Sequence, residues 1–367
     1  MDLEELRTAL TELDGELVRI IARRQALSEQ VAAVKRATGR PTRDFARERE
    51  VIVRGRSAAA QLGVSPDLAE SLLRQLIQSS LATQEQARVA AQALGTGKRA
   101  LVIGGHGKMG GWFADFLASQ GFRVFIADPA GALEGFGYVA DWSRDPLDQD
   151  LIVIATPLSA TPDVLFTLAR ARPAGLIFDL GSLKTPLRGG LHALVQAGCR
   201  VTSVHPMFGP NTELLSGRHV IFIDLGCAPA LAQAQELFAS TMAERAVMGL
   251  DEHDRLIAYV LGLSHALNIA FFTALADSGE AAPRLARLSS TTFDSQLDVA
   301  ALVAAESPDL YFEIQHLNDY GGESLHALQA AVTRLVTMVE SGDAAGFTAL
   351  MKRGRLYLDG RAALRAS

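Results

Sequence analysis

The sequence predicts three structural parts: an all-α helical domain at residues 1–92, an α/β doubly wound domain at residues 98–245, and an all-α C-terminal domain at residues 246–367. Apolar residues recur at threes and fours at both ends of the chain, which is the period of an amphipathic helix. Short apolar runs that end in polar loops fill the middle, as expected of a parallel sheet. A length of 367 residues is enough for two or three domains.

The stretch at residues 98–129 predicts that the α/β part binds a dinucleotide. An apolar run at residues 100–103 is followed by Gly105, Gly107 and Gly110 in a GxGxxG pattern. These glycines permit a tight turn, a close approach of the backbone to a pyrophosphate, and close packing of the next helix. Asp128 ends the second strand 23 positions after Gly105, where an acid accepts hydrogen bonds from the ribose of NAD. We therefore predict a Rossmann-type NAD domain.

The N-terminal part contains three predicted helices. The first spans residues 2–37, the second follows Asp44 and runs to about residue 57, and the third begins at Ser65. Small residues at 90–97 form a linker to the α/β domain. A helix of 36 residues is too long to bury its apolar stripe against two shorter helices, so we expect it to pack against a second chain.

Basic residues are concentrated in this part, although the formal net charge of the chain is −6. Residues 19–56 hold eleven Arg or Lys against four acids, but Phe45 is the one aromatic residue of the N-terminal part, so nucleic-acid binding by base stacking is not expected. At 100° per residue, Arg24 and Lys35 share one face of the first helix, and Arg7 points about 100° away. The alternative is a solvated face with ordinary salt bridges.

Eight polar residues of this part have the spacing of one enzyme family. They are Arg7, Arg24, Lys35, Asp44, Arg47, Glu48, Ser80 and Gln84, and the run RDFARERE is the most specific segment. In type and spacing they resemble the active site of the all-helical chorismate mutases. The resemblance implies that Arg7, from the partner protomer, holds substrate carboxylates together with Arg24 and Arg47. It also implies that Lys35 and Gln84 flank the ether oxygen and that Glu48 takes the substrate hydroxyl. The rearrangement needs only a compact conformer and stabilised charge.

Apolar runs at residues 150–155, 175–180, 200–204 and 219–223 extend the predicted sheet, and a helix is expected at about residues 229–243. Cofactor contacts are expected from Gly105, Gly107, Met109, Gly110, Asp128, Thr156 and Pro157. His205 follows one strand and precedes a Pro-Met-Phe-Gly-Pro loop, so we expect it near the nicotinamide as a general base. A structural, hydrogen-bonded histidine is the alternative.

Long apolar stripes predict C-terminal helices at residues 251–276, 308–340 and 343–365. A helical region behind a nucleotide-binding domain commonly forms a dimer and completes the site. His253 and His265 lie 12 positions apart on one helix, which corresponds to about 120° of rotation. Either can belong to the site, and the alternatives are a surface capping histidine and a buried one.

The motifs GGHGKMG, GSLK, HPMFGP and EHD, with a histidine 12 positions further on, resemble prephenate dehydrogenase. With the helical part in front, the whole chain resembles the bifunctional chorismate mutase–prephenate dehydrogenases of tyrosine biosynthesis. The resemblance implies that His205 accepts the proton of the prephenate ring hydroxyl, that hydride passes to NAD, and that CO2 leaves. It also implies that Lys184 and His265 line the substrate pocket. We expect a homodimer, and any feedback inhibition by tyrosine would act at the dehydrogenase site or between protomers.

Two positions depart from this family's pattern. The family's two arginines in the helical domain correspond to Asp294 and Leu302 here, and residues 288–308 hold no arginine. Arg284 and Arg287 lie just before that segment and are the expected substitutes. Ala155 stands where relatives often have a serine that orients the catalytic histidine, and Thr156 is next to it.

Three functions therefore stay open for the second half of the chain. The leading one is NAD-linked oxidative decarboxylation of prephenate. The second keeps the folds but uses arogenate or a 4-amino-4-deoxy analogue of prephenate, although His205 suits a ring hydroxyl better. The third is a degenerate dehydrogenase that senses NAD or tyrosine.

The compartment follows from the N-terminus and the cysteines. The charged, helical N-terminus does not read as a signal peptide, and no run reaches 18 apolar residues, so neither secretion nor a membrane span is expected. Cys199 and Cys227 lack metal-like spacing and suit a reduced cytoplasmic protein. The sequence gives no sign of a metal site.

Overall fold

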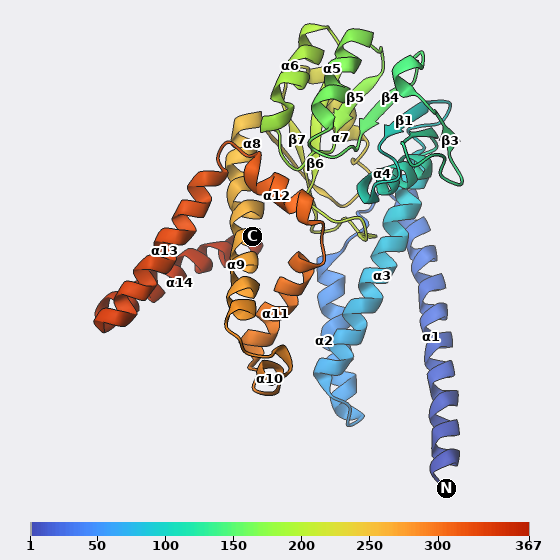
Figure 1. Cartoon of the computed structure of the whole chain (residues 1–367). Coiled ribbons are helices and arrows are strands. Elements are labelled where there is room, and N and C mark those ends of the chain that lie inside the picture. Colours follow the sequence, from blue (N-terminus) through green and yellow to red (C-terminus); the bar gives the residue numbers. More distant parts are fainter. Residues whose placement is uncertain (1, 367) are drawn as a thin grey trace. The chain divides into compact units, whose positions relative to one another are not determined.

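The computed structural model describes residues 2–366, which fold into two compact units (Figure 1). One unit runs from the N-terminus to Gly181 and from Gly189 to Met248, and the other comprises Ser182–Arg188 and the chain from Gly249 onward. The N-terminal helices therefore share a unit with the sheet.

Three helices form the N-terminal part: α1 (Leu3–Ala37), α2 (Phe45–Gln61) and α3 (Pro66–Gln92). The side chains of Asp2, Asp44 and Ser65 cap their first turns by accepting hydrogen bonds from backbone N–H groups. Helix α3 ends in the predicted linker at Gln92, where Ala93 turns the chain with a φ of 46°, so the first three linker residues are helical.

Helix α1 leaves its apolar stripe uncovered within the chain. Ala32 is its one buried residue, whereas the leucines of its first half are 45–62% exposed: Leu3, Leu6, Leu10, Leu13 and Leu17. An exposed stripe of this length is typical of a helix that packs against another chain.

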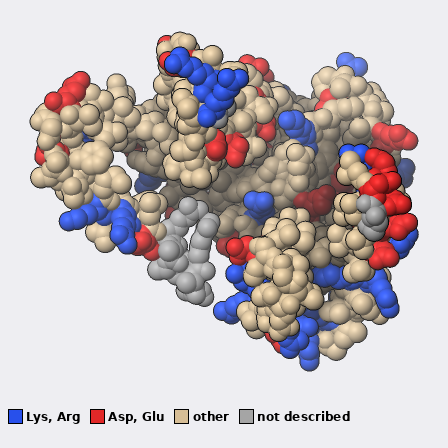
Figure 2. All heavy atoms as spheres, turned by 90° about the horizontal axis from the view of Figure 1, so that it is seen from below, with Lys and Arg blue, Asp and Glu red and all other residues tan. Residues whose placement is uncertain are grey.

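Ion pairs neutralise much of the charge on α2 and α3. Arg56 contacts Asp67 and Glu70 at 2.7 Å each, and Arg74 contacts Glu70 at 2.5 Å. On the face of the molecule that Figure 2 shows, basic and acidic side chains lie near one another in several places. These helices carry mixed charge and not a patch of one sign.

An eight-stranded sheet forms the rest of the first unit. Its strands are β1 (Arg99–Ile103), β2 (Arg123–Ala127), β3 (Gly137–Tyr138), β4 (Leu151–Ile154), β5 (Leu176–Asp179), β6 (Arg200–Pro206), β7 (His219–Ile223) and β8 (Glu244–Met248). Their order is β3-β2-β1-β4-β5-β6-β7-β8, and all neighbours are parallel except β6 and β7. The reversal of order beside β1 confirms the predicted doubly wound fold.

The connecting helices are α4 (Lys108–Ser119), α5 (Thr161–Ala171), α6 (Arg188–Gln196) and α7 (Ala228–Glu236), with short 3₁₀ turns η1 (Trp142–Arg144) and η2 (Thr185–Leu187). Helix α7 ends seven residues before the predicted end, because the chain turns to form β8, which the sequence did not reveal. Strand β6 is longer than predicted and includes His205 and Pro206, since both pair with β7.

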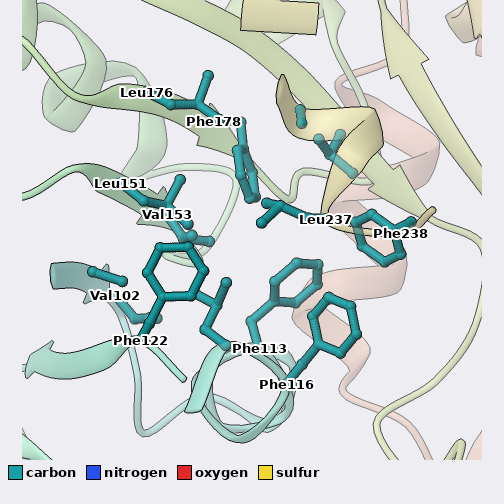
Figure 3. Close-up of a cluster of buried hydrophobic side chains, with 14 of the residues drawn as sticks. Val102, Phe113, Phe116, Phe122, Leu151, Val153, Leu176, Phe178, Leu237 and Phe238 are labelled. Atoms are coloured by element: carbon teal, nitrogen blue, oxygen red, sulfur yellow. The ribbon is translucent and has the colours of Figure 1, made fainter. Parts of the chain in front are cut away.

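Aromatic side chains fill the core between the sheet and helices α4 and α7 (Figure 3). Phe113 of α4 lies edge-on to Phe178 of β5, with ring centroids 6.1 Å apart. Phe116 stacks on Phe238 at 5.0 Å. Each such pair stabilises the fold by about 0.5–1.5 kcal/mol beyond its buried area, so the packing fixes α4 and the turn before it against the sheet.

Helices form the second unit: α8 (Leu250–Ile257), the π-helix η3 (Ala258–Leu263), α9 (Ser264–Asp277), α10 (Ala282–Arg287), α11 (Thr291–Ala304), α12 (Pro308–His316), α13 (Gly321–Ser341) and α14 (Ala344–Ala366). The prediction missed α10 and α11. The predicted helix at 308–340 is broken, because Asn318 caps a turn with its side chain.

Within the described residues, the continuous helical stretch Leu250–Asp277 is long and apolar enough to cross a membrane by length and composition alone. Core helices of proteins without membrane spans pass the same test. In this stretch Asp254 and Asn268 are buried and hydrogen-bonded inside the unit.

Candidate functional site

A cavity of about 340 Å³ lies among the three N-terminal helices. It is lined by seven of the eight predicted mutase residues, namely Arg24, Lys35, Asp44, Arg47, Glu48, Ser80 and Gln84. Apolar residues such as Leu27, Val31 and Ile77 complete the wall. Most of the lining residues are polar or charged, so the cavity suits a small ligand that carries charge.

Arg24 is fixed from the side of α3. Its Nη1 donates to the Leu76 carbonyl oxygen at 2.9 Å and to Ser80 Oγ at 2.8 Å. Ser80 Oγ in turn donates to Gln25 Oε1 at 2.8 Å. Burial lowers the pKa of Arg24, because desolvation disfavours the charged guanidinium. An anion in the cavity would offset this cost.

Lys35 and Gln84 also line the cavity. Lys35 Nζ donates to the Thr42 carbonyl oxygen at 2.6 Å, and Gln84 Nε2 lies 2.8 Å from Ser28 Oγ. Gln84 Oε1 is buried without a hydrogen-bond partner among the described residues. If the amide is turned by 180°, the Ser28 hydroxyl donates to Oε1 and the NH2 group is left as a donor.

The start of α2 places three of the predicted residues. Asp44 Oδ1 accepts the backbone N–H of Arg47 at 2.9 Å, so it acts as a helix cap as well as a wall of the cavity. Arg47 Nη1 pairs with Glu50 at 2.5 Å. The Glu48 carboxylate accepts two hydrogen bonds from Arg43, one from Nε at 2.9 Å and one from Nη2 at 3.0 Å. Arg43 begins the run RDFARERE, but sequence reasoning gave it no role of its own.

Arg7 is absent from the residues that line this cavity. Its side chain is 64% exposed and pairs with Glu4 of the same helix at 2.6 Å. Arg7 lies 17 positions before Arg24 on α1, about 26 Å along the helix axis, so the geometry separates it from the other seven.

The turn between β1 and α4 has little space for side chains. Gly104, which sequence reasoning passed over, takes the left-handed φ of +89° and makes the bend. A Cβ on Gly105 would lie 2.4 Å from Ile126, and one on Gly110 would lie 2.2 Å from the Gly104 carbonyl oxygen. Gly107 caps α4, whose first turn includes Met109. This cradle of bare backbone at a helix N-terminus fits a dinucleotide pyrophosphate.

Asp128 holds this turn from β2. Its Oδ2 accepts the backbone N–H of His106 at 3.0 Å, and its Oδ1 accepts that of Ala130 at 2.9 Å. A carboxylate has about four acceptor positions, so about two remain for ribose hydroxyls. Thr156 and Pro157 follow β4, and Thr156 Oγ1 lies 2.9 Å from Thr161 Oγ1 at the start of α5. The Thr156 hydroxyl is thus engaged in its own turn.

His205 lies inside β6, opposite Ile221 of β7, and is 4% exposed. The sequence placed it just after the strand, but the pairing with β7 continues two residues further. It remains near the carboxyl end of β6, and ligands of a doubly wound sheet bind beyond that edge.

In the second unit, Asp254 accepts several hydrogen bonds from the segment that carries Lys184. Its carboxylate accepts the backbone N–H of Lys184 at 2.9 Å, the N–H and hydroxyl of Thr185 at 2.5 Å each, and His253 Nδ1 at 2.6 Å. Burial raises the pKa of Asp254, but the hydrogen bonds from His253 and Thr185 prevail and lower it. His253 and Lys184 are fully buried. His253 thus supports Asp254, in line with the structural alternative.

His265 lies on α9 with its ring centroid 4.2 Å from that of Tyr311 on α12. Burial lowers the pKa of His265, because desolvation disfavours the charged ring. The sequence did not single out Tyr311. Leu302 and Arg284 are both exposed, and Arg284 pairs with Glu280 at 3.1 Å.

Three family models match the chain in succession. Residues 6–85 match chorismate mutase type II, residues 135–247 match the nucleotide-binding domain of prephenate dehydrogenase, and residues 250–353 match its dimerization domain. A T-protein of Enterobacter agglomerans is 26% identical over 356 residues, which cover 96% of this chain and 92% of the relative. A chorismate mutase of Methanocaldococcus jannaschii is 30% identical over 84 residues, which cover 23% of this chain and 85% of the relative.

The chain belongs to the bifunctional chorismate mutase–prephenate dehydrogenases. A 4-amino-4-deoxyprephenate dehydrogenase of Streptomyces pristinaespiralis is 29% identical over 263 residues, or 69% of this chain and 88% of the relative. The crystal structure of prephenate dehydrogenase from A. aeolicus with hydroxyphenyl propionate and NAD+ shares the fold, with a TM-score of 0.56 and 18% identity over 71% of this chain and 96% of that one.

These matches divide the candidate residues between the two activities. The mutase match spans all eight residues of the N-terminal set. The nucleotide-binding match includes Thr156, Lys184 and His205 but begins after the glycine turn and Asp128. The dimerization match includes His265 and the apolar helix α9.

Proposed function

We propose that this chain is a bifunctional enzyme of tyrosine biosynthesis. Its N-terminal helices rearrange chorismate to prephenate, and the rest of the chain converts prephenate to 4-hydroxyphenylpyruvate and CO2 with NAD as oxidant. The observation that carries the proposal is the cavity shared by seven mutase residues, in the same chain as a glycine turn held by Asp128. One activity makes the substrate of the other.

The mutase cavity is suited to a unimolecular rearrangement. Such a reaction gains from orientation and from stabilised charge, and it needs no nucleophile. Arg24 and Arg47 bring two guanidinium groups to the cavity, which suits a dicarboxylate because guanidinium binds carboxylate in a bidentate manner. Glu48, held by Arg43, accepts the substrate hydroxyl.

Lys35 and Gln84 act on the ether oxygen, where negative charge develops. Lys35 supplies a positive charge to the cavity. Gln84 supplies its NH2 group when the amide is turned so that Oε1 accepts from Ser28, which also removes the unpartnered buried oxygen. This orientation supports donation by both residues to the same atom.

The dehydrogenase half holds its cofactor through backbone and one carboxylate. The amides at the start of α4 bind the pyrophosphate, and Asp128 accepts hydrogen bonds from the adenosine ribose. NAD, when bound, supplies the hydride acceptor. His205 takes the proton of the ring hydroxyl. Lys184 and His265 bind prephenate in this proposal, which rests on their motifs, and the neutral His265 acts as a hydrogen-bond partner and not as a cation.

A homodimer completes the mutase site. The exposed stripe of α1 supports it, as does the separation of Arg7 from the cavity. We expect Arg7→Ala and Lys35→Ala to be inactive alone as mutases. When mixed and re-associated, they should recover about a quarter of the wild-type rate, since half of the dimers are mixed and half of their sites are intact. Absence of recovery would mean that Arg7 acts within its own chain.

An amino analogue of prephenate is the second candidate substrate. The relative named 4-amino-4-deoxyprephenate dehydrogenase supports it, as does the lack of the family's arginines at Asp294 and Leu302. Competing rates with prephenate, arogenate and 4-amino-4-deoxyprephenate decide between them. We further propose a reducing, cytoplasmic setting, which the two free cysteines support, and feedback inhibition by tyrosine.

The direct test is NADH formation at 340 nm from chorismate and NAD alone. Coupled turnover is expected, and His205→Asn should abolish it while chorismate is still consumed. Accumulation of prephenate without NADH would leave the mutase and overturn the dehydrogenase.

A further inference from the structure

The loop between β6 and β7, residues 207–218, contacts the mutase helices at two adjacent residues. The backbone N–H of Leu215 donates to the Glu85 carboxylate on α3 at 2.7 Å. The Ser216 hydroxyl accepts from Arg43 Nη1, just before α2, at 2.6 Å. The pairs are 130 and 173 residues apart in sequence, so only the fold brings them together.

Arg43 transmits this contact to the mutase cavity. Its Nε and Nη2 grip both carboxylate oxygens of Glu48, at 2.9 and 3.0 Å, which fixes the plane of that carboxylate. Its guanidinium carbon also lies 4.3 Å from the centre of the Phe45 ring. Ser216 accepts a hydrogen bond from the third nitrogen, Nη1, so each guanidinium nitrogen of Arg43 has an acceptor.

The loop itself is held in place on the other side. Glu85 is buried and accepts backbone N–H groups from both Leu215 and Met242. It follows Gln84 on α3 and so joins the mutase helix to the loop next to a cavity residue. The backbone next to Ser216 is therefore anchored to α3.

We propose that Ser216, a residue of the nucleotide-binding domain, is a positioning residue of the mutase site: it orients Arg43, and Arg43 orients Glu48. This proposal rests on the mutase function proposed above. It makes the dehydrogenase domain a structural part of the mutase, so the two activities share one loop.

The test uses full-length variants and follows each half-reaction separately, as loss of chorismate and as NADH formation from added prephenate. Ser216→Ala should lower mutase kcat/KM about tenfold, because a hydrogen bond to a charged group is lost. The rate with prephenate should stay at the wild-type level. Ser216→Thr, which keeps the hydroxyl, should restore most of the mutase activity. The exposed Ser71→Ala on α3 is the matched control.

A double-mutant cycle separates positioning from general stability. Arg43→Met should lower mutase activity by more than Ser216→Ala, and adding Ser216→Ala to it should have no further effect, because both act through Glu48. The exposed Arg49→Met on α2 serves as its control.

Three outcomes would overturn this proposal, and a fourth would refute the proposed function. Wild-type mutase kinetics in Ser216→Ala would overturn the proposal, and so would equal losses of both activities with a lower melting temperature, which would mark a purely structural contact. Losses that multiply in the double variant would also overturn it. Absence of mutase activity in the wild-type protein, with prephenate still oxidised, would instead refute the proposed function.

Discussion

The Glu85 carboxylate lies 2.7 Å from the backbone nitrogen of Leu215 and joins the mutase helix α3 to the dehydrogenase loop. It also accepts the backbone N–H of Met242. Burial raises the pKa of Glu85, because desolvation of the carboxylate outweighs these two bonds and the nearby Arg88. A group that joins two activities is therefore sensitive to pH.

Glu85 should make the stability of the first unit depend on pH. The folded state binds a proton on Glu85 more readily than the unfolded chain does, in which the carboxyl pKa is about 4.3. The contribution of Glu85 to the free energy of unfolding is therefore fully present below about pH 4.3. It is lost as the pH rises through the raised pKa of the folded state. Glu85→Gln should remove this slope and cost about 1–3 kcal/mol, since one backbone N–H loses its acceptor. Urea unfolding from pH 4 to 8 measures both the loss of stability and its dependence on pH. The substitution Glu236→Gln at an exposed position is the control. Parallel profiles for wild type and variant would contradict the account.

Gly110→Ala should disable the dehydrogenase and spare the mutase. The new Cβ would lie 2.2 Å from the Gly104 carbonyl oxygen, so α4 must move away from the turn that holds the cofactor. We expect a KM for NAD raised by more than about tenfold, which corresponds to about 1.4 kcal/mol. Gly111→Ala is a matched control, because its Cβ would meet Gly105 O at an ordinary 3.6 Å. Equal effects of the two substitutions would show that the cradle does not set affinity.

Asp128 should determine the preference for NAD over NADP. Its carboxylate would repel a 2′-phosphate and accept ribose hydroxyls, while it also holds the His106 amide at 3.0 Å. Asp128→Asn should reduce the ratio of kcat/KM for NAD to that for NADP by about tenfold, and Asp128→Ala should also weaken both cofactors by loosening the turn. Steady-state kinetics with each cofactor measures this, and an unchanged ratio in both variants would assign the preference elsewhere.

Asp254 should make the second unit sensitive to acid. Because its folded pKa is lowered, its contribution is fully present above the unfolded value of about 3.9 and is lost as pH falls through the folded pKa. Asp254→Asn should cost about 1–3 kcal/mol, since it turns an amide NH2 group toward buried backbone donors and leaves at least one of them without an acceptor. Hydrogen exchange of residues 182–188 should then accelerate, whereas the exposed Asp298→Asn should leave it unchanged. Equal protection of residues 182–188 from hydrogen exchange in the two variants would show that Asp254 does not hold this segment.

Local signals made much of the fold predictable. Asp44 and Ser65 indicate where helices begin, because their side chains accept hydrogen bonds from free backbone N–H groups of the first turn. Apolar runs of four to six residues indicate buried strands. Strand β8 escaped notice because its residues are partly exposed and lack a clear apolar run. The π-helix at Ala258–Leu263 keeps the composition of an ordinary helix and so leaves no trace in the sequence.

The sequence by itself determined the chemistry of the two sites. Helical spacing places Arg24 and Lys35 on one face of the first helix. A glycine turn followed by Asp128 specifies a site for a dinucleotide. Only the tertiary structure decided what holds those groups. Ser216, Arg43 and Glu85 act through contacts between residues far apart in the chain, and such contacts leave no periodic pattern. The tertiary structure also leaves Arg7 and the apolar stripe of α1 exposed, because this 35-residue helix is longer than the helices of its own chain that could cover it.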